Sequence, residues 1–336
     1  MSSLTLFKEK FEPQYHALVT HYVHDFFSER ISHAQPEIIE YMCSGKRIRP
    51  FLIWIMAGMP DIYDGPIACA GYAVELFHAM ALIHDDIIDE SSMRRGAPTP
   101  HHTLTKHTNH DRHIGESLAL LWGDYILMKS YTHIHELPLH VQKTFSRMYE
   151  VTVHGQVHDV MNSILPFNRV SVSDIERVHT LKTGLYTFAL PMRIGAELSN
   201  DLIDQSENVL QDIERLGLRI GTLFQLRDDI IDMLPASNKE QWKDIREGTV
   251  TWVSGYVRTH HVHLYDQLVA YKADPRPEAF TALTEQLALI SWQDVFSKET
   301  ADIIATIHKD IDEASYMNTT QKDALRALVA QLQKLG

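Results

Sequence analysis

Residues 74–89 read VELFHAMALIHDDIID, and this stretch decides the class of fold. Its apolar residues recur every three or four positions, with Phe77, Met80 and Ile83 as examples, which is the spacing of one face of an α-helix. Residues 118–128 repeat this helical spacing, and neither stretch follows the strict alternation that is typical of a half-buried strand. The sequence therefore predicts an all-α fold.

Glycine and proline divide the pattern into long helical segments. The breaks fall at residues 59–66, 96–100, 165–166, 235–238 and 275–277. With only 15 Gly and 13 Pro in 336 residues, and no tract rich in Ser, Gly and Pro, the composition marks no flexible linker. The chain is 44% hydrophobic, which is enough for a large core. We predict one helical domain over residues 1–336.

A local signal predicts one helix start. Ser173 is followed three residues later by Glu176, which is the spacing of a capping box. We expect a helix to begin there and to run through Lys182, and we expect Pro191 to interrupt or kink it.

The composition excludes several partners. A formal net charge of -13 argues against binding to nucleic acid or anionic lipid. Only Cys43 and Cys69 are present, and the start of the chain lacks the pattern of a secretory signal, so we expect a cytoplasmic location. The longest purely apolar stretch, residues 51–59, is about half of the ~20 residues that a membrane-spanning helix needs. We therefore expect no transmembrane segment.

The pentapeptide Asp-Asp-Ile-Ile-Asp occurs twice. On a helix, positions i, i+1 and i+4 project from adjoining parts of one face, so the carboxylates of each cluster can meet near one point. Repulsion among them favours a bound cation, and oxygen-only ligands suit Mg²⁺. A single acidic cluster is usually a solvated helix face, but two identical clusters flanked by apolar residues favour the mouth of an apolar cavity. The predicted Mg²⁺ ligands are Asp85, Asp86, Asp89, Asp228, Asp229 and Asp232.

Two basic patches accompany the acidic clusters. Gly45-Lys46-Arg47-Ile48-Arg49-Pro50 precedes the most hydrophobic run of the chain, and Arg94-Arg95-Gly96 follows the first acidic cluster. Arginine binds phosphate oxygens bidentately and lysine acts as a point charge, so the patches could hold two separate phosphate groups. Taken alone, either patch is equally compatible with ordinary solvated surface charge.

In combination, these motifs resemble the trans-isoprenyl diphosphate synthase family. The resemblance covers roughly residues 40 to 250, and the agreement of so many ordered motifs is specific even though each one is short. The motifs are Gly45-Lys46-Arg47-x-Arg49-Pro50, His84-Asp85-Asp86-x-x-Asp89, Arg94-Arg95-Gly96-x-Pro98-Thr99, Gly123-Asp124, Gly155-Gln156-x-x-Asp159, Lys182-Thr183-Gly184 and Phe224-Gln225-x-x-Asp228-Asp229-x-x-Asp232.

The resemblance implies a bundle of long antiparallel helices around a deep central cavity, usually in a homodimer. It implies a head-to-tail condensation of isopentenyl diphosphate with an allylic prenyl diphosphate that yields an all-trans product. The six aspartates would hold Mg²⁺ and with it the allylic diphosphate, helped by Arg94, Lys182, Thr183 and Gln225. The residues that match the positions for the diphosphate of isopentenyl diphosphate are Lys46, Arg49, His78 and Arg95.

The residues before the first acidic cluster predict the length of the product. If this helix lines the cavity, Ala81, Met80 and Phe77 face the growing chain one and two turns below the aspartates. Alanine permits elongation, methionine is a flexible partial obstruction, and Phe77 lies deeper. We expect the twenty-carbon geranylgeranyl diphosphate ahead of the fifteen-carbon farnesyl diphosphate, with longer products as a further alternative.

The chain departs from the family pattern in three places. Thr249 stands where the family has a lysine, the loop before Asp244 is short and leaves Lys239 or Lys243 as substitutes for another lysine, and the common C-terminal arginine is missing. The missing lysine keeps open a weakly active regulatory subunit of a heteromeric synthase. A terpene cyclase or head-to-head condensing enzyme ranks lower, because such enzymes lack the basic residues, here Lys46, Arg49 and Arg95, that would bind a second diphosphate. The 21 histidines show no paired spacing of a structural zinc site.

Overall fold

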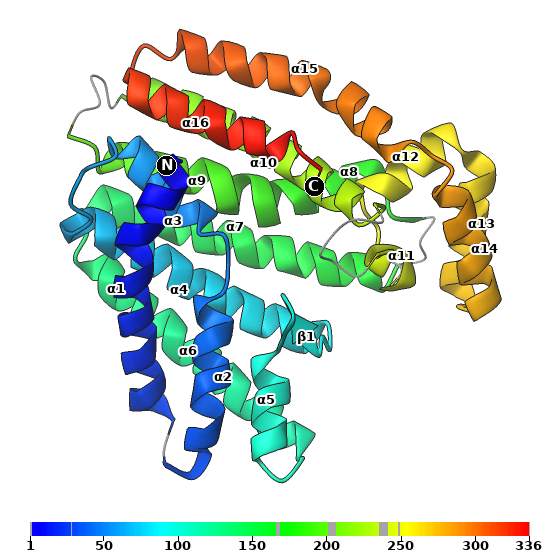
Figure 1. Ribbon diagram of the computed structural model, residues 1–336, viewed down its shortest axis with the longest axis horizontal. Coiled ribbons are helices and arrows are strands. Elements are labelled where there is room, and N and C mark those ends of the chain that lie inside the picture. The colour runs from blue at the N-terminus through cyan, green and yellow to red at the C-terminus, as the bar shows by residue number, and fades with distance from the viewer. Residues whose placement is uncertain are drawn as a thin grey trace. The chain divides into compact units, whose positions relative to one another are not determined.

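The computed structural model describes residues 2–27, 29–165, 169–200, 206–234, 241–247 and 249–335. Within these residues the regular structure is almost entirely helical, and the strands are limited to the short antiparallel pair β1 Met93–Arg94 and β2 Ala97–Pro98 (Figure 1). The all-α prediction is confirmed. The expected breaks at residues 59–66, 96–100 and 275–277 each end at the start of a helix, at residues 65, 100 and 277, whereas residues 166 and 235–238 lie outside the described residues.

The chain divides into two compact units. Unit 1 comprises Met1–Ser146 and Pro191–Gln205, and unit 2 comprises Arg147–Leu190 and Ser206–Gly336. The helix α7 Leu139–Ser163 begins in unit 1 and ends in unit 2, and α9 Leu190–Glu197 belongs to unit 1 after its first residue. The single domain expected over residues 1–336 stays a prediction.

Unit 1 combines helices of 24 residues with helices of 8 or 9 residues. Two of them, α4 and α6, pack against each other, and α3 and α5 also contact this pair (Figure 1). In chain order the elements of unit 1 before α7 are α1 Ser3–Phe26, the 3₁₀ segment η1 Glu29–Ala34, α2 Gln35–Cys43, α3 Ile48–Met56, α4 Gly65–Ile88, α5 Pro100–His107 and α6 Arg112–His135.

Aromatic side chains build the core beneath the basic loop of unit 1. Phe7 and Phe11 of α1 stack with ring centroids 5.3 Å apart, and the ring of Phe7 lies 5.6 Å from that of Trp54 in α3. All three side chains are almost fully buried. Burial of each large apolar side chain contributes roughly 1.5–3 kcal/mol, so α3 is held firmly where the basic loop enters it.

Helix α4 is the core helix of unit 1. In the part of the chain that the structure describes, it is the one helix whose length and composition would suit a membrane span, and 61% of its most apolar stretch is buried inside the protein. Buried core helices share this composition, and α4 also carries the ionisable residues Glu75, Asp85 and Asp86. The finding is weak evidence for a span, and the expected lack of a transmembrane segment stays a prediction.

Unit 2 is organised around α10, whose buried face packs against η3 and α15. Short helices follow α10 along the chain, and two longer ones close the unit (Figure 1). Its elements are α8 Val172–His179, the π-helix η3 Thr180–Ala189, α10 Glu207–Ile231, α11 Lys243–Glu247, α12 Trp252–His260, α13 Val262–Ala273, α14 Pro277–Leu287, α15 Trp292–Glu313 and α16 Thr319–Leu332.

The predicted start of the helix before Lys182 is wrong by two residues. The capping box is formed by Ser171, whose side chain accepts from the N–H of Asp174, while the Asp174 carboxylate accepts from the N–H of Ser171 at 2.9 Å. Ser171 and Asp174 have the same spacing as Ser173 and Glu176, and the carboxylate of Asp174 reaches back to the cap. Spacing alone could not distinguish the two pairs.

The chain does stay helical through Lys182, as predicted, but the type of helix changes before this residue. The α-helix α8 ends at His179, and the next ten residues form the π-helix η3, in which the N–H of Leu190 donates to the carbonyl of Leu185. The π-helix returns to an α-helix at Leu190, so Pro191 lies in the first turn of α9. Long π-helical turns are rare and occur frequently at functional sites, which directs attention to Lys182 and Thr183.

Candidate active site

The first acidic cluster forms the last turn of α4. The helix ends at Ile88 and Asp89 is its C-cap, with an N–H that donates to the carbonyl of Asp85 at 2.8 Å. Asp86 is completely buried, Asp85 is half-buried and Asp89 is exposed. The three carboxylates therefore differ in their surroundings although they share one helical turn.

Both oxygens of the Asp86 carboxylate are engaged. Nε of Arg94 donates to Oδ1 of Asp86 at 2.7 Å, and the hydroxyl of Tyr41 donates to Oδ2 at 2.6 Å. Nη2 of Arg94 reaches Oδ2 of Asp85 at 3.1 Å. Burial raises the pKa of Asp86, and the Arg94 guanidinium and the Tyr41 hydroxyl oppose this rise. Sequence reasoning missed Tyr41, since no motif marks it.

Positive charge gathers around His78, two turns before the acidic cluster on α4. The pKa of His78 lies well below its ordinary value, because burial opposes the imidazolium and the guanidinium groups of Arg49, Arg95 and Arg94 repel it. Unit 1 therefore brings together Arg49 of α3, His78 of α4 and the arginines of the β1–β2 hairpin. Lys46 lies in the loop directly before α3 and is exposed.

The residues that were expected to set product length lie in the core of unit 1. The side chain of Phe77 is 2% exposed and that of Met80 is 7% exposed, while Ala81 is half-buried. Phe77 is thus packed deeply below the acidic turn, as a cavity floor requires. Its role in product length stays a prediction.

In unit 2, Lys182 is paired with an aspartate of α7. Its Nζ lies 2.6 Å from Oδ2 of Asp159. A Cβ atom on Gly155 would lie 2.8 Å from Cγ of Lys182, so a glycine is needed at this position to let the lysine stem pass. Asp159 belongs to a family-like motif, but the sequence analysis assigned it no role.

A chain of hydrogen bonds connects η3 to the second acidic cluster. The hydroxyl of Thr183 donates to Oε1 of Gln225 at 2.8 Å, and Nε2 of Gln225 donates to Oδ1 of Asp229 at 2.6 Å. The N–H of Trp252, at the start of α12, donates to Oδ2 of Asp229 at 2.9 Å. Asp229 is 3% exposed, and Asp228 beside it is half-buried. Thr183, Gln225 and Asp229, which were all predicted to serve the allylic diphosphate, thus form one network.

Asp232 has a structural contact that the sequence did not indicate. It is the C-cap of α10, and its carboxylate accepts from the N–H of Lys243 at 3.1 Å and from the N–H of Asp244 at 3.2 Å. It therefore caps α11 as well as ending α10. The substitute Lys239 and the residue before Thr249 lie outside the described residues.

The donor atoms of both acidic clusters fit a hard divalent cation. Arg94 already places a cationic group between Asp85 and Asp86, which shows that this turn accommodates positive charge. Among the described residues, no three Asp, Glu, His or Cys side chains surround a common point. Mg²⁺ is usually bound by one or two carboxylates together with substrate phosphates, so a closed protein cage is not required.

The predicted site residues fall into two groups. Lys46, Arg49, His78, Arg94, Arg95 and the first acidic cluster belong to unit 1, whereas Lys182, Thr183, Gln225 and the second acidic cluster belong to unit 2. Within each unit the structure places predicted residues close together. The convergence of the two acidic clusters stays a prediction.

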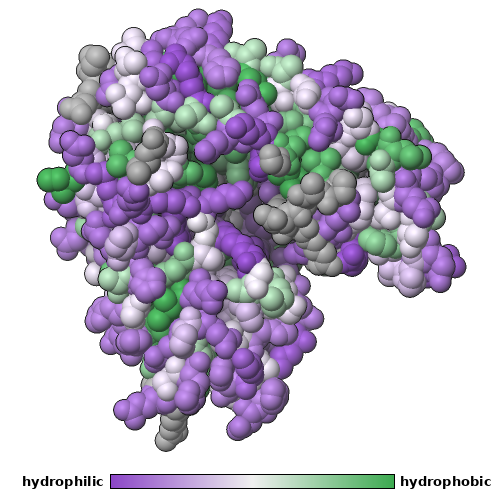
Figure 2. Space-filling view, viewed as in Figure 1, coloured by the Kyte–Doolittle hydropathy of each residue, from purple (hydrophilic) through white to green (hydrophobic). Residues whose placement is uncertain are grey.

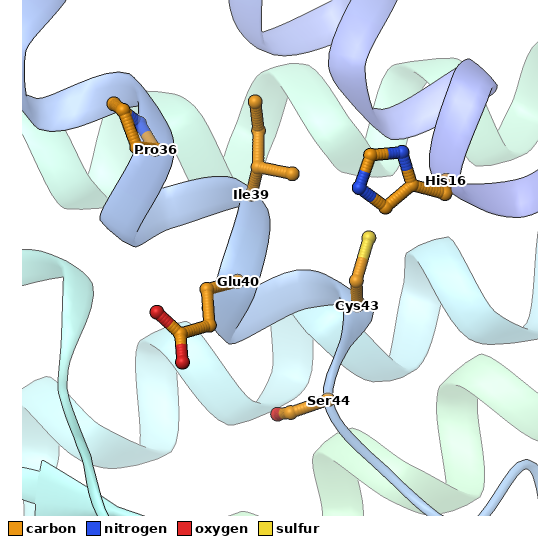
Figure 3. Close-up of a pocket in the computed structure, with 6 residues that line it drawn as sticks. All are labelled: His16, Pro36, Ile39, Glu40, Cys43 and Ser44. Carbon is orange, nitrogen blue, oxygen red and sulfur yellow. The ribbon is translucent and has the colours of Figure 1, made fainter.

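A groove between α1 and α2 of unit 1 has a volume of about 560 Å³ and is lined by none of the predicted site residues. Figure 3 shows the thiol of Cys43 directed toward the ring of His16, and Figure 2 shows exposed apolar residues between these helices among hydrophilic ones. Burial raises the pKa of Cys43 to about 11, which keeps the thiol neutral and unreactive. The lining residues are His16, Pro36, Ile39, Glu40, Cys43 and Ser44.

Solved structures share this fold. Geranylgeranyl pyrophosphate synthase from Corynebacterium glutamicum, which was crystallised with isoprenyl diphosphate and magnesium, superposes with a TM-score of 0.80 at 24% sequence identity. The superposition covers 97% of this chain and 99% of that protein. At this level of identity the likeness supports the fold alone.

Curated relatives also match the chain. Geranylgeranyl pyrophosphate synthase 4 from Arabidopsis thaliana is 30% identical over 63% of this chain, and the alignment spans 56% of that relative, so a little over half of its length is matched. Farnesyl pyrophosphate synthase from Candida albicans is 26% identical over 80% of this chain and 76% of its own length. Residues 33–287 match the polyprenyl synthetase family. The chain therefore belongs to the polyprenyl synthetase family.

Proposed function

We propose that the protein is a Mg²⁺-dependent trans-prenyltransferase that condenses isopentenyl diphosphate head to tail with an allylic prenyl diphosphate. The observation that carries this proposal is the arrangement of α4 in unit 1. The last turn of α4 carries the carboxylates of Asp85 and Asp86, and the imidazole of His78 and the buried ring of Phe77 lie two turns earlier on the same helix. The β1–β2 hairpin brings Arg94 to the two carboxylates and Arg95 near His78. The names of the relatives from Arabidopsis and Candida support the same reaction.

The first chemical step would be ionisation of the allylic diphosphate. Cations stabilise the negative charge that develops on the leaving group, and Arg94 and Lys182 would take this role. Mg²⁺, held by Asp85, Asp86 and Asp89 and by the second acidic cluster, would supply further positive charge to the same group. In the structure Arg94 is paired with Asp86 and Lys182 with Asp159, so both cations are oriented before substrate binds.

The second step would join the two substrates. Arg49, Arg95, His78 and Lys46 would hold the diphosphate of isopentenyl diphosphate, whose double bond attacks the allylic cation before a proton is lost. The low pKa of His78 keeps its ring neutral near pH 7, where it can donate one hydrogen bond and accept another. The apolar side chains of Phe77 and Met80 would exclude water from the cation.

Geranylgeranyl diphosphate is the proposed product, with farnesyl diphosphate as the alternative. Ala81 is small and half-buried, so it would not block a growing prenyl chain beside the acidic turn. Phe77 is large and buried two turns below Asp85, so it would limit the length of that chain. The two curated relatives carry names for a twenty-carbon and a fifteen-carbon product, and therefore support either length.

A homodimer in the cytoplasm is part of the proposal. On α6, Ile114, Leu121 and Met128 follow one another at seven-residue intervals and are 43%, 56% and 62% exposed. Residues seven apart lie on the same face of a helix, so these side chains form an exposed apolar stripe. A second copy of unit 1 would cover such a stripe from water.

The purified chain with Mg²⁺, isopentenyl diphosphate and, in turn, dimethylallyl, geranyl and farnesyl diphosphates tests the proposal. We expect turnover that depends on isopentenyl diphosphate and is abolished by a chelator, with products identified by mass spectrometry. Asp86→Ala should remove this turnover while the fold, followed by circular dichroism, is retained. An inactive chain that gains activity only with a second synthase would instead indicate a regulatory subunit, and turnover without isopentenyl diphosphate would indicate a cyclase.

A further inference from the structure

Three neighbouring cations in the basic loop have different surroundings. Arg47 is 4% exposed, whereas Lys46 beside it is exposed and Arg49 is half-buried. Arg47 also has a left-handed backbone conformation, with φ at 59°, immediately before α3. A non-glycine residue holds this conformation only where surrounding contacts enforce it.

Two carboxylates and an aromatic ring enclose the Arg47 guanidinium. Nε lies 3.1 Å from Oε1 of Glu12, and Nη1 lies 2.8 Å from Oε2 of Glu75. The guanidinium carbon lies 4.6 Å from the centre of the Tyr15 ring. Burial alone would lower the pKa of Arg47, but Glu75 raises it, so Arg47 remains charged. This cluster draws residues from α1 and α4 onto one side chain.

The same guanidinium closes the end of α2. It donates through Nη1 to the carbonyl of Met42 and through Nη2 to the carbonyl of Cys43. The last carbonyls of a helix lack partners inside the helix and carry partial negative charge. Arg47 therefore satisfies two of them while it is itself anchored by Glu12 and Glu75.

The next two carbonyls of the loop are also bound by cationic side chains. Nη1 of Arg95, from the β1–β2 hairpin, donates to the carbonyl of Ser44 at 2.9 Å, and Nζ of Lys8, from α1, donates to the carbonyl of Gly45 at 3.5 Å. Four consecutive carbonyls are thus held by side chains from separate parts of unit 1. Lys46 follows directly after them.

We propose that Arg47 is a positioning residue of the site for isopentenyl diphosphate. The buried ion cluster around Arg47 fixes the loop between α2 and α3. Lys46 and Arg49 are therefore already ordered when the diphosphate binds, and the part of the loop that contacts Arg95 is held in place as well. This inference rests on the proposed function. A preordered loop avoids the entropy loss that a mobile loop would suffer on binding, and a displacement of ~1 Å can lower a rate by a factor of about 100.

Steady-state kinetics of Arg47→Lys and Glu12→Gln test this role. Arg47→Lys keeps the charge but loses the planar fork that reaches two carboxylates and two carbonyls. We expect it to raise the KM for isopentenyl diphosphate by about ten- to a hundredfold, with little change in the KM for the allylic diphosphate or in the Mg²⁺ activation curve. Glu12→Gln removes one anchor and should raise the same KM by roughly threefold.

Arg193→Lys is the matched control. Arg193 is 14% exposed and pairs with Glu197 at 2.8 Å in the same unit, so this variant also replaces a buried guanidinium. It should lower the melting temperature and leave the KM for isopentenyl diphosphate unchanged. If Arg47→Lys does not fold, Glu12→Gln tests the positioning role by itself. In that variant Arg47 is still present and keeps its contact with Glu75.

The outcomes separate a failure of the positioning role from a failure of the proposed function. The positioning role would be overturned, and the proposed function left intact, by either of two results with an active wild-type chain. In the first, the variants lose thermal stability but keep the KM for isopentenyl diphosphate. In the second, the variants raise the KM values for both substrates equally. A wild-type chain that neither turns over nor binds isopentenyl diphosphate in calorimetry would overturn both. A selective rise in that KM for both variants supports the positioning role.

Discussion

At the scale of single residues, aspartates of the same motif differ in burial and in hydrogen bonding. Asp86 is buried and bonded to Tyr41 and Arg94, whereas Asp89 in the same motif is exposed. Asp229 accepts from Gln225 and from the backbone of α12. An ionised carboxylate is stable in a buried position only when hydrogen bonds replace its hydration. The aspartates with the fullest sets of hydrogen bonds therefore include the second one of each cluster, and Asp232 joins them through two backbone N–H groups.

Replacement of Phe77 by alanine should lengthen the product. Phe77 is 2% exposed and lies two turns below Asp85, so truncation opens space in the direction in which the chain would grow. Mass analysis of the products should show a shift toward species longer by one or more five-carbon units. Leu76→Ala is the matched control, since Leu76 is also fully buried on α4 but points about 100° away. Unchanged product lengths in Phe77→Ala would exclude Phe77 as the floor.

A buried histidine should make the protein less stable in mild acid. Burial, with a smaller contribution from His102, lowers the pKa of His101 to about 4 in the folded protein, below the ordinary value of 6.5. Between these two values the unfolded chain binds a proton that the folded chain does not, so stability is full above pH 6.5 and is lost as the pH falls toward 4. The loss should reach roughly 2–3 kcal/mol.

Urea unfolding at pH 7 and pH 5 measures this effect. The difference in unfolding free energy between the two values should shrink in His101→Gln and persist in His102→Gln, whose side chain is exposed. An equal acid dependence in His101→Gln and in the wild type would contradict the assignment.

At the scale of elements, the irregular helix η3 determines what α10 can face. The π-helix carries Lys182 and Thr183, and α10 carries Gln225, which bonds to Thr183. A π-helix has a wider turn than an α-helix and changes the direction of the side chains that follow. The contact between these two elements therefore positions the network that ends on Asp229.

Replacement of Gly217 by alanine should separate α10 from η3. A Cβ atom on Gly217 would lie 2.5 Å from the Cα of Ala189 and 2.8 Å from its nitrogen, and backbone atoms cannot move aside as a side chain can. Alanine gains about 1 kcal/mol in helix propensity, but overpacking costs about 1–3 kcal/mol or more. We expect net destabilisation, measured by urea unfolding, together with a higher KM for the allylic diphosphate.

Thr222→Ala provides the comparison for this variant. Thr222 lies on the exposed side of α10, so its replacement should change the free energy of unfolding by no more than about 0.5 kcal/mol. A Gly217→Ala protein as stable as Thr222→Ala would show that the close approach of the two helices is not required.

At the scale of the whole molecule, the proposed reaction needs residues from both units. In the proposal, unit 1 would supply the residues that bind one diphosphate and the first acidic turn, and unit 2 would supply Lys182 and the second acidic cluster. The net charge of -13 repels anionic substrates at long range. Binding must therefore depend on the few cations that the fold gathers locally, with divalent metal as the complement.

A charge in the apolar stripe of α6 should disrupt self-association. Leu121 is 56% exposed and lies between Ile114 and Met128 on the same helix face. Leu121→Glu would bury an unpaired carboxylate in a dimer interface, which is strongly unfavourable. Sedimentation velocity should show a shift from dimer to monomer, while His24→Glu on the exposed side of α1 should leave the dimer intact. A monomeric wild-type chain would contradict the proposed homodimer.

The sequence by itself determined the all-α class, several of the breaks between helices and the two acidic turns, because periodicity and glycine or proline breaks are local properties. The close association of Thr183, Gln225 and Asp229 also agrees with motifs found in the sequence. The helical pattern and its breaks depend on neighbours a few residues apart, and the chain encodes them directly, whereas Thr183 and Gln225 are 42 residues apart and meet only through the fold.

Tertiary structure alone decided which of several similar residues takes each role. Ser171 rather than Ser173 caps α8, and Arg47 rather than Lys46 enters the core. The π-helix after His179 and the partnership of Tyr41 with Asp86 have no local signature. In each case the choice depends on packing against segments that are distant in sequence, where burial and complete hydrogen bonding outweigh the small local preferences between neighbouring side chains.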